Sequence, residues 1–182
     1  MLGQPGYLRV YGWYLAALIL SVGVSSAAPG DDLLSLADRQ KLAEVALDLK
    51  GAILREDAEG VLRHVSKASG LRCTDTQIPY RQIKRDLQNK NTHLYMSVFD
   101  SNSWSKRCGS EYPVEYPAIS DKEFFATAEQ VAMEIEPIEK DWVKVTFKSN
   151  KKSQYPREFS FHRERGIWRL TDGFVVSRCS CG

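Results

Sequence analysis

One carboxylate and one arginine in the last third of the chain are the residues best placed to do chemistry. Asp172 has the same parity as the apolar Trp168 and Leu170, so it is predicted to face the interior. A buried carboxylate is costly unless it is paired or hydrogen-bonded. Arg157 has inward parity on the preceding strand, and a β-bulge at Gly166 would set Asp172 opposite residue 157 or 159. The sequence therefore predicts an Arg157–Asp172 pair.

This pair has two interpretations. Asp172 is either a general base or ligand anchor in a pocket, or a structural residue, as one half of an ion pair or as a bulge residue before Gly173. An acid–base site usually adds a histidine or tyrosine within reach. Aromatic side chains that could line a pocket with Asp172 are Tyr80, Tyr95, Trp142 and Trp168, and the three histidines, His64, His93 and His162, are interpreted as surface or core residues. A His–Asp or Tyr–Asp cluster remote from Arg157 would favour an enzyme.

Four cysteines form the second chemically capable set: Cys73, Cys108, Cys179 and Cys181. An even number of cysteines in an exported chain indicates disulfides, and four allow three full pairings. A Cys73–Cys108 bond would leave Cys179 and Cys181 as either a strained local bridge or a reactive pair. Zinc binding and free thiols are the alternatives, although for zinc the spacing lacks a second paired knuckle.

Several functional classes lack their signatures. The sequence contains no phosphate-binding glycine loop, no dinucleotide fingerprint, no HExxH and no CxxC pair, so no cofactor or metal is expected. The net charge of +2 gives no reason to expect nucleic acid. Residues 111–141 hold nine acids and two bases, and residues 142–182 hold nine bases and three acids. This asymmetry indicates neighbouring strands of opposite charge, or alternatively a basic surface for an acidic partner.

The N-terminal residues have the pattern of a secretory signal. An apolar run of 15 residues, Val10–Val24, is shorter than the ~20 that a spanning helix needs. Ser25 and Ala27 suit the −3 and −1 positions of a signal peptidase site, which places cleavage after Ala27. We therefore expect residues 1–27 to be a signal and residues 28–182 to form one exported domain, periplasmic or secreted, with no stable membrane insertion after cleavage. An uncleaved anchor is the alternative.

Helices are expected first in the mature chain. Ser35 and Asp57 are predicted to cap two helices, the first ending near Gly51, and Pro79 opens a third. The segment HLYMSVFD, residues 93–100, fits both helical and strand periods. Residues 101–120 are rich in serine, proline and glycine and are predicted to form a long loop. Ser120 and Glu123 then form a capping box for a further short helix.

The last third is predicted to be an antiparallel sheet of about four strands. Apolar residues alternate with polar ones from Val131, from Val143, from Tyr155 and from Trp168, with turns between these segments. One apolar and one charged face indicate a sheet covered on one side only. Glu134 and Glu136 are predicted to lie on the strand next to Lys144 and Lys148. A homodimer through this sheet is one expected assembly.

Two segments resemble the NTF2-like superfamily, a cone-shaped α+β fold. AILREDAEGVLRHVS, residues 52–66, is similar to the helix-break-helix common there, and ERGIWRLTDGF, residues 164–174, is similar to its closing hairpin. The resemblance implies an α+β domain with N-terminal helices packed on one face of a curved C-terminal sheet, and a pocket at the open end. The whole chain also resembles exported bacterial proteins of unknown function.

A non-catalytic domain that binds a small molecule or an envelope protein is the function expected from the sequence. The alternative is a dehydratase- or isomerase-type enzyme that uses a pocket carboxylate. An enzyme needs convergent titratable groups with shifted pKa values, whereas a binding domain needs only a cavity or an exposed patch. The side chains lining the open end of the sheet distinguish the two hypotheses.

Overall fold

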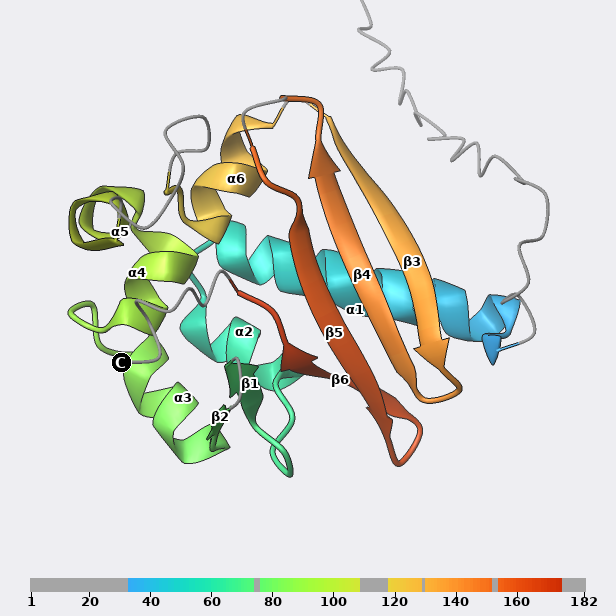
Figure 1. Cartoon of the computed structure of the whole chain (residues 1–182). Helices are drawn as coiled ribbons and strands as arrows, with labels where there is room; N and C mark the ends of the chain where they lie inside the picture. Colours follow the sequence, from blue (N-terminus) through green and yellow to red (C-terminus); the bar gives the residue numbers. More distant parts are fainter. Residues whose placement is uncertain (1–32, 74–75, 109–117, 129, 152–153, 175–182) are drawn as a thin grey trace, which may run out of the picture.

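The chain folds into helices packed against one face of a curved sheet (Figure 1). The computed structural model describes residues 33–73, 76–108, 118–128, 130–151 and 154–174. The helices are α1 Leu36–Leu54, α2 Ala58–His64, α3 Tyr80–Leu87, α4 His93–Phe99, α5 Ser101–Cys108 and α6 Asp121–Thr127. The strands are β1 Leu71–Cys73, β2 Thr76–Ile78, β3 Val131–Glu139, β4 Trp142–Ser149, β5 Arg157–Glu164 and β6 Ile167–Asp172.

The predicted N-caps are confirmed. The side chains of Ser35, Asp57 and Ser120 accept hydrogen bonds from backbone N–H groups in the first turns of α1, α2 and α6. Each cap satisfies an N–H group that would otherwise lack an intrahelical partner. Helix α1 continues through Gly51 to Leu54, past its predicted end. The burial of neighbouring apolar residues outweighs the ~1 kcal/mol cost of a helical glycine.

Two segments between the N-terminal helices and the sheet are helical. Residues 93–99 form α4, which settles the ambiguous period of that segment. The predicted loop over residues 101–120 is wrong for its first part, because α5 runs from Ser101 to Cys108. Asp100 accepts a hydrogen bond from the Ser103 N–H at this start, and Trp104 is fully buried. Tertiary burial of a tryptophan thus overrides the loop-like composition. Residues 109–117 lie outside the described residues.

The sheet has six strands in the order β2-β1-β6-β5-β4-β3 and is mixed, so the prediction of about four antiparallel strands is incomplete. Strands β1 and β2 pair antiparallel with each other, and β1 runs parallel to β6 through the pair Arg72–Asp172. Each of these two strands has only three residues. A segment that short has too few positions for alternation to be recognised. Strands β2 and β3 form the edges, and the homodimer through the sheet stays a prediction.

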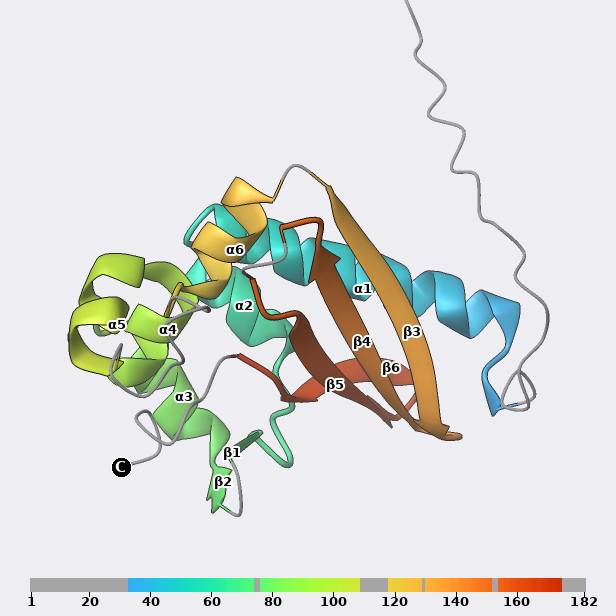
Figure 2. The ribbon, with the colours of Figure 1, turned by 45° about the horizontal axis from the view of Figure 1, so that its top comes forward.

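One face of the sheet is covered by helices and the other is open to solvent (Figure 2). The covered face carries the buried side chains Val143, Val145, Phe147, Phe159, Phe161, Trp168 and Leu170, which join the helices in one core. On the open face, Lys144 Nζ lies 2.7 Å from Glu136, and Lys148 Nζ lies 2.6 Å from Glu134. The predicted cross-strand ion pairs are therefore confirmed. We call these two faces the inner and the outer face.

The closing hairpin differs from the prediction at its bulge. Arg165 and Gly166 form the two-residue turn with φ of 50° and 81°, as a type I′ turn requires. The register shift lies instead at the far end of β6, where Phe161 pairs with Leu170 but Ser160 pairs with Asp172. Because the side-chain period of a strand is two, this bulge turns Asp172 to the outer face. The predicted inward position of Asp172 is corrected accordingly.

The predicted signal, residues 1–27, lies outside the described residues. Among the helices that the structure does describe, none is both long and apolar enough to cross a membrane. Cleavage and export stay predictions.

The described residues include only part of the predicted disulfide set. Cys73 is buried, and none of the described cysteines is a free thiol. The side chain of Cys108 and the whole of Cys179 and Cys181 lie outside the described residues. The pairing between them stays a prediction.

Candidate functional site

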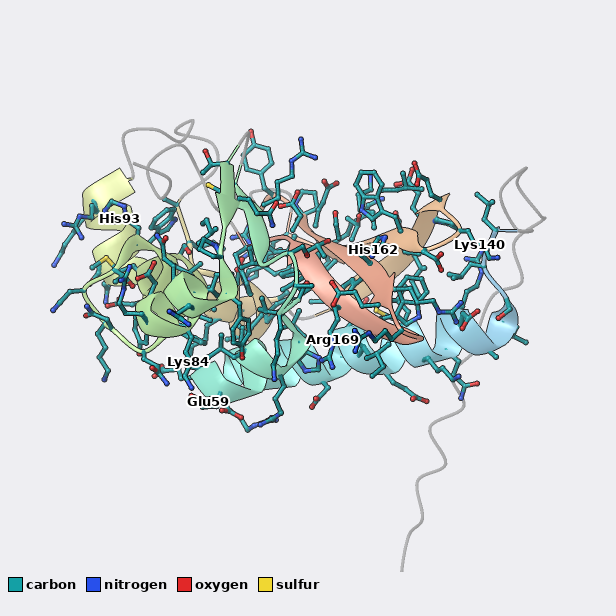
Figure 3. The ribbon with its side chains drawn as sticks, turned by 90° about the horizontal axis from the view of Figure 1, so that it is seen from below. Glu59, Lys84, His93, Lys140, His162 and Arg169 are labelled. Atoms are coloured by element: carbon teal, nitrogen blue, oxygen red, sulfur yellow. The ribbon has the colours of Figure 1, made fainter. Side chains whose placement is uncertain are left out.

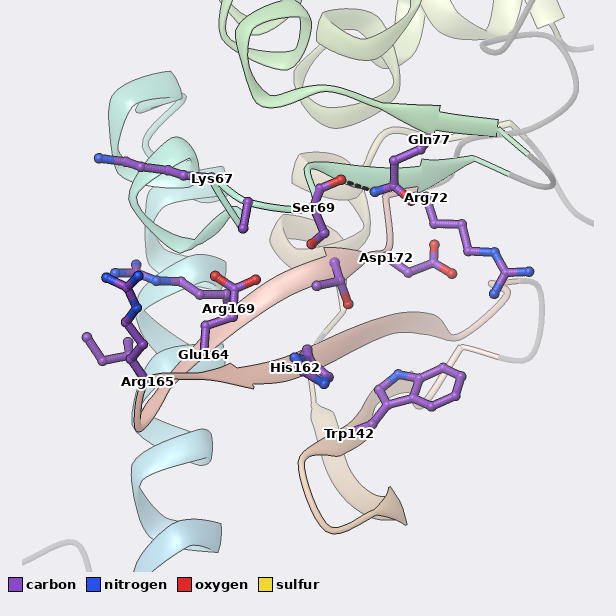
Figure 4. Close-up of a pocket in the computed structure, with 13 residues that line it drawn as sticks. Lys67, Ser69, Arg72, Gln77, Trp142, His162, Glu164, Arg165, Arg169 and Asp172 are labelled. Carbon is purple, nitrogen blue, oxygen red and sulfur yellow. Dashed lines mark hydrogen bonds between the residues drawn. The ribbon is translucent and has the colours of Figure 1, made fainter.

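A groove of about 920 Å³ lies on the outer face, between the β1–β2 hairpin and the strands β4, β5 and β6 (Figure 4). We call it the outer groove. Its volume is within the range typical of small-molecule sites. The lining residues are Lys67, Ala68, Ser69, Arg72, Gln77, Trp142, His162, Glu164, Arg165, Ile167, Arg169, Thr171 and Asp172. The outer groove therefore lies on the face of the sheet opposite the described helices.

Asp172 is brought into this groove by the bulge at the end of β6. Its Oδ1 accepts a 2.7 Å hydrogen bond from the Gly173 N–H, and Arg72 lies opposite on β1. Burial raises the pKa of the Asp172 carboxyl, and the Gly173 hydrogen bond and the charge of Arg72 only partly offset this rise. A half-buried carboxyl of this kind can accept or donate a hydrogen bond to a ligand.

The backbone after Asp172 allows few substitutions. Gly173 has φ of 130°, and a Cβ there would lie 2.5 Å from Phe159 Cδ1. Phe174 has φ of 64°, which is rare for a bulky residue. Glycine adopts a positive φ without strain, whereas the backbone of Phe174 is strained, and strained positions persist only where the surrounding structure fixes them. The end of β6 is thus a rigid support for the Asp172 carboxyl.

Four cationic side chains line the groove, against two carboxylates. Arg169 donates a hydrogen bond of 2.5 Å to the Arg63 carbonyl, which fixes its guanidinium at one end of the groove. Arg165 lies on the adjacent turn and is exposed. Glu164 accepts a 2.5 Å hydrogen bond from Ser66, and the ammonium of Lys67 lies over the Tyr80 ring at 5.9 Å. Arg165 and Arg169 are therefore the cations best placed to receive an anion.

An aromatic wall closes the other side of the groove. Trp142 and His162 are directly paired on β4 and β5, so their side chains share the outer face. In Figure 4 the His162 ring and the Trp142 indole stand beside Asp172 and Arg72. A planar ligand could stack on such a wall while its polar groups meet the arginines and the carboxyl.

The predicted Arg157–Asp172 pair is not formed. Arg157 lies opposite Phe147 on β4, on the inner face, and its Nε is 2.7 Å from Asp121 Oδ1 at the start of α6. Its guanidinium also stacks over Phe124 at 4.8 Å and donates to the Ile119 carbonyl. The buried guanidinium of Arg157 is therefore paired with a carboxylate from helix α6. Arg157 is a core residue.

Tyr95 and Trp168 are also core residues. Tyr95 packs in α4 with its ring centroid 5.0 Å from that of Phe99. Trp168 is 3% exposed and anchors β6 on the inner face, with the Arg163 guanidinium 5.2 Å from its ring. The inward parity predicted for Trp168 is therefore confirmed. Among the predicted pocket residues, only Asp172 and Trp142 lie in the outer groove.

The three histidines are widely separated. His162 lies in the outer groove, and His93 begins α4 at the far end of the molecule (Figure 3). His64 ends α2, where its Nε2 lies 3.0 Å from Asp48 Oδ2 on α1. Burial lowers the pKa of His64, and the neighbouring Asp48 carboxylate only partly offsets this effect. His64 lines a smaller hollow of about 460 Å³ between α1 and the β5–β6 turn.

The described residues contain no group of three or more His, Cys, Asp and Glu side chains able to hold a metal ion. The groove instead combines fixed cations, a carboxyl and an aromatic wall, which suits recognition of a small organic anion.

Sequence reasoning missed most of the groove. Arg72 and Gln77 come from strands too short to be recognised, and no pattern in the sequence distinguishes Arg165 and Arg169 from other basic residues. The one available signal was the excess of basic residues after position 142, which the sequence analysis interpreted as paired strands or a basic surface.

No family model matches the sequence, and no curated protein matches it. Two solved structures are similar to it. An NTF-2 like protein of unknown function from Shewanella oneidensis MR-1 is 13% identical with a TM-score of 0.36, over 74% of this chain and 95% of that chain. A candidate aromatic ring hydroxylase from Novosphingobium aromaticivorans is 12% identical with a TM-score of 0.38, over 79% of this chain and 92% of that chain. Both TM-scores are below 0.5, so neither similarity bears on the family or the activity of this chain.

Proposed function

We propose that this protein is a non-catalytic ligand-binding domain whose outer groove holds a small organic anion with a planar body. One observation carries the proposal. Cationic side chains outnumber carboxylates four to two in a groove that also presents the Trp142 indole. Guanidinium groups bind carboxylates and phosphates through charge-assisted hydrogen bonds, and an indole offers a large apolar face. An anion with an aromatic ring satisfies both.

The site has the size and position that such binding requires. About 920 Å³ is enough for a small organic molecule, and the groove lies on the face of the sheet opposite the described helices. Arg169 is held in place by the Arg63 carbonyl before any ligand arrives. A preorganised guanidinium loses less conformational freedom on binding, which favours affinity.

The proposal is tested with 2-naphthoate, a rigid aromatic carboxylate. Titration into the ¹⁵N-labelled protein should shift the indole N–H signal of Trp142 and the backbone signals of β5 and β6. Arg165→Gln and Arg169→Gln should each weaken binding about tenfold, since each removes a charge-assisted hydrogen bond. Arg85→Gln is the matched control, because Arg85 is an exposed arginine on α3 outside the groove.

Two results would reject the binding proposal. One is the absence of any shift at millimolar 2-naphthoate. The other is an equal loss of affinity in the Arg85→Gln control, since that would mean that the anion responds only to net charge. High salt provides a further check, because a charge-dependent site should weaken as ionic strength rises.

Acid–base catalysis is the second candidate function. The observation that favours it is that the Asp172 carboxyl, whose pKa is raised by burial, shares the groove with His162. This is the His–Asp combination, remote from Arg157, that the sequence associates with a dehydratase- or isomerase-type enzyme. Incubation with 4-acetylbenzoate in D₂O tests it. Deuterium exchange at the methyl group that is faster with the wild type than with Asp172→Ala would support catalysis, and equal rates would reject it.

We also propose that the domain acts outside the cytoplasm after cleavage behind Ala27. The apolar run and the small residues before that position support this proposal. Expression of the full chain in a bacterial host, followed by N-terminal sequencing of the protein recovered from each compartment, tests it. A periplasmic product beginning at Ala28 is expected. A product that keeps Met1 and stays with the membrane fraction would favour the uncleaved anchor.

A further inference from the structure

We propose that Asp172 is the specificity-determining residue of the outer groove, selecting anions that carry a hydroxyl or ammonium donor at the end remote from the anionic group. This inference rests on the proposed binding function and adds the chemical class of the ligand. An organic acid with a distant donor, such as a hydroxy-aromatic carboxylate, fits this description. A simple aromatic acid without a donor does not.

The arginines and the Asp172 carboxyl are separated along the groove. Arg165 lies on the turn that precedes β6. Asp172 is the last residue of β6 and lies beside β1. Strand residues advance about 3.3 Å each, so even Arg169 and Asp172 are separated by roughly 10 Å of backbone. Figure 4 shows Arg165 and Arg169 at one end of the groove and Asp172 at the other. A ligand that meets both ends must therefore carry two different polar groups.

The Asp172 carboxyl has unused acceptor capacity. A carboxylate offers about four lone-pair positions. In the part of the chain that the structure describes, the hydrogen bond recorded to this carboxyl is the one from Gly173 N–H to Oδ1. Arg72 contributes its charge from β1. A donor on the ligand would therefore find an acceptor that is already oriented and partly desolvated.

Two local features of the backbone hold the Asp172 carboxyl in place. The bulge opposite Ser160 and Phe161 turns Asp172 to the outer face. The close packing of Gly173 against Phe159 and the positive φ of Phe174 then fix the end of β6. Without the bulge, Asp172 would point into the apolar core beside Trp168 and Leu170. The geometry thus serves to place one carboxyl in the groove.

Stability does not explain a carboxylate at this position. Asp172 is half-buried, and burial disfavours its charged form. Within the described residues, no cation lies at salt-bridge distance from Asp172, and the charge of the neighbouring Arg72 offsets only part of this cost. A neutral side chain would fit with a smaller desolvation cost. Proteins keep such unfavourable groups mainly where function needs them.

The experiment compares two probes of the same shape, 2-naphthoate and 6-hydroxy-2-naphthoate, which differ by one hydroxyl remote from the carboxylate. Dissociation constants are measured at pH 7 by NMR titration. The wild type should bind the hydroxylated probe about tenfold more tightly, as expected for a hydrogen bond to a charged acceptor. Asp172→Ala should bind both probes with equal affinity. Glu158→Ala, which removes an exposed carboxylate of β5 outside the groove, should keep the preference.

The outcomes distinguish a failure of the role proposed for Asp172 from a failure of the proposed binding function. Equal binding of both probes by the wild type overturns the role of Asp172 and leaves the anion site standing. A preference that survives in Asp172→Ala also overturns it. Binding of neither probe overturns the proposed function and this inference with it. If Asp172→Ala does not fold, Asp172→Asn replaces it, and a preference as large as that of the wild type would again overturn the inference.

Discussion

Arg157 Nε lies 2.7 Å from Asp121 Oδ1, and both side chains are almost completely buried, at 7% and 0% exposed. The pair joins β5 of the sheet to the first turn of α6. Asp121 also lies at the N-terminal end of its helix, where the backbone dipole stabilises a negative charge. Two charges buried in this way hold a helix at a fixed position on the inner face.

Removal of one member of this pair should be strongly destabilising. Asp121→Leu leaves the Arg157 guanidinium buried without its charged partner, and breaking a buried ion pair in this way costs about 3–5 kcal/mol. Urea denaturation followed by circular dichroism measures the change in the free energy of unfolding. The double variant Asp121→Leu, Arg157→Met should recover most of the loss, since well-packed apolar replacements are often neutral.

A double variant as unstable as the single one would contradict this account. It would mean that the hydrogen bonds from Arg157 to the Ile119 and Tyr155 carbonyls, and not the ion pair, hold α6. Lys148→Ala is the matched control, because it breaks an exposed ion pair with Glu134. Exposed pairs of that kind are worth less than about 1 kcal/mol.

The error over Arg157 illustrates what sequence patterns can and cannot provide. Parity correctly placed Arg157 on the inner face, and the need for a partner was a sound inference. The partner itself came from α6, a helix 36 positions earlier in the chain, and alternation within strands carries no information about that contact. Parity failed for Asp172 because one bulge residue reverses the face of everything after it.

Replacing each of two glycines of the closing hairpin by alanine should distinguish the cost of a positive φ from the cost of a steric clash. Gly166→Ala keeps open space around its Cβ, so it should cost only about 1 kcal/mol for the positive φ. Gly173→Ala adds a Cβ 2.5 Å from Phe159 and 3.1 Å from the Glu158 carbonyl, and should cost about 3 kcal/mol or more. Thermal unfolding of the two variants gives the comparison. Equal costs would show that the end of β6 relaxes freely.

The stability of the fold should fall as the pH drops below the ordinary histidine range. Burial lowers the pKa of His64 from its usual 6.5, so the unfolded chain binds more protons than the folded one in this window. Stability is therefore complete above pH 6.5 and declines as the pH falls through the folded pKa. Charged groups near His64 are Asp48, Arg63 and Arg169, with Lys41 and Glu44 lining the same hollow.

His64→Gln tests this dependence while keeping a donor for Asp48. Urea midpoints between pH 5 and pH 8 should change less for the variant than for the wild type. His93→Gln is the control, because His93 begins α4 far from this hollow. An unchanged slope in His64→Gln would mean that other groups account for the pH dependence.

The pH dependence of stability contributed by Asp172 should be opposite in sign to that contributed by His64. Its carboxyl has a pKa raised above 3.8 by burial, so the folded chain holds this proton more tightly than the unfolded chain. The contribution is complete below pH 3.8 and is lost as the pH rises through the folded pKa. Asp172→Asn should therefore be more stable than the wild type at pH 7, with the difference shrinking toward pH 4. A variant less stable at pH 7 would show that the ionised carboxylate supports the fold.

The architecture was easier to predict than the site. Helix caps at Ser35, Asp57 and Ser120 and the alternation of β3 to β6 are local signals, and the structure confirms them. The outer groove depends on β1 and β2, which have three residues each, and on a bulge that sequence alternation does not reveal. A site assembled from short strands and a register shift has no sequence signature of its own.

Cys73 should be disulfide-bonded in protein recovered under oxidising conditions. The residue is buried and is not a free thiol. Its position on β1 means that a bond would tie this short strand, and with it Arg72 of the outer groove, to another part of the chain. Alkylation before and after reduction, followed by peptide mass spectrometry, identifies the partner among Cys108, Cys179 and Cys181. Because a disulfide typically contributes about 2–4 kcal/mol, Cys73→Ser should lower the unfolding free energy by a similar amount and weaken 2-naphthoate binding. Four free thiols in the oxidised protein would contradict the disulfide prediction.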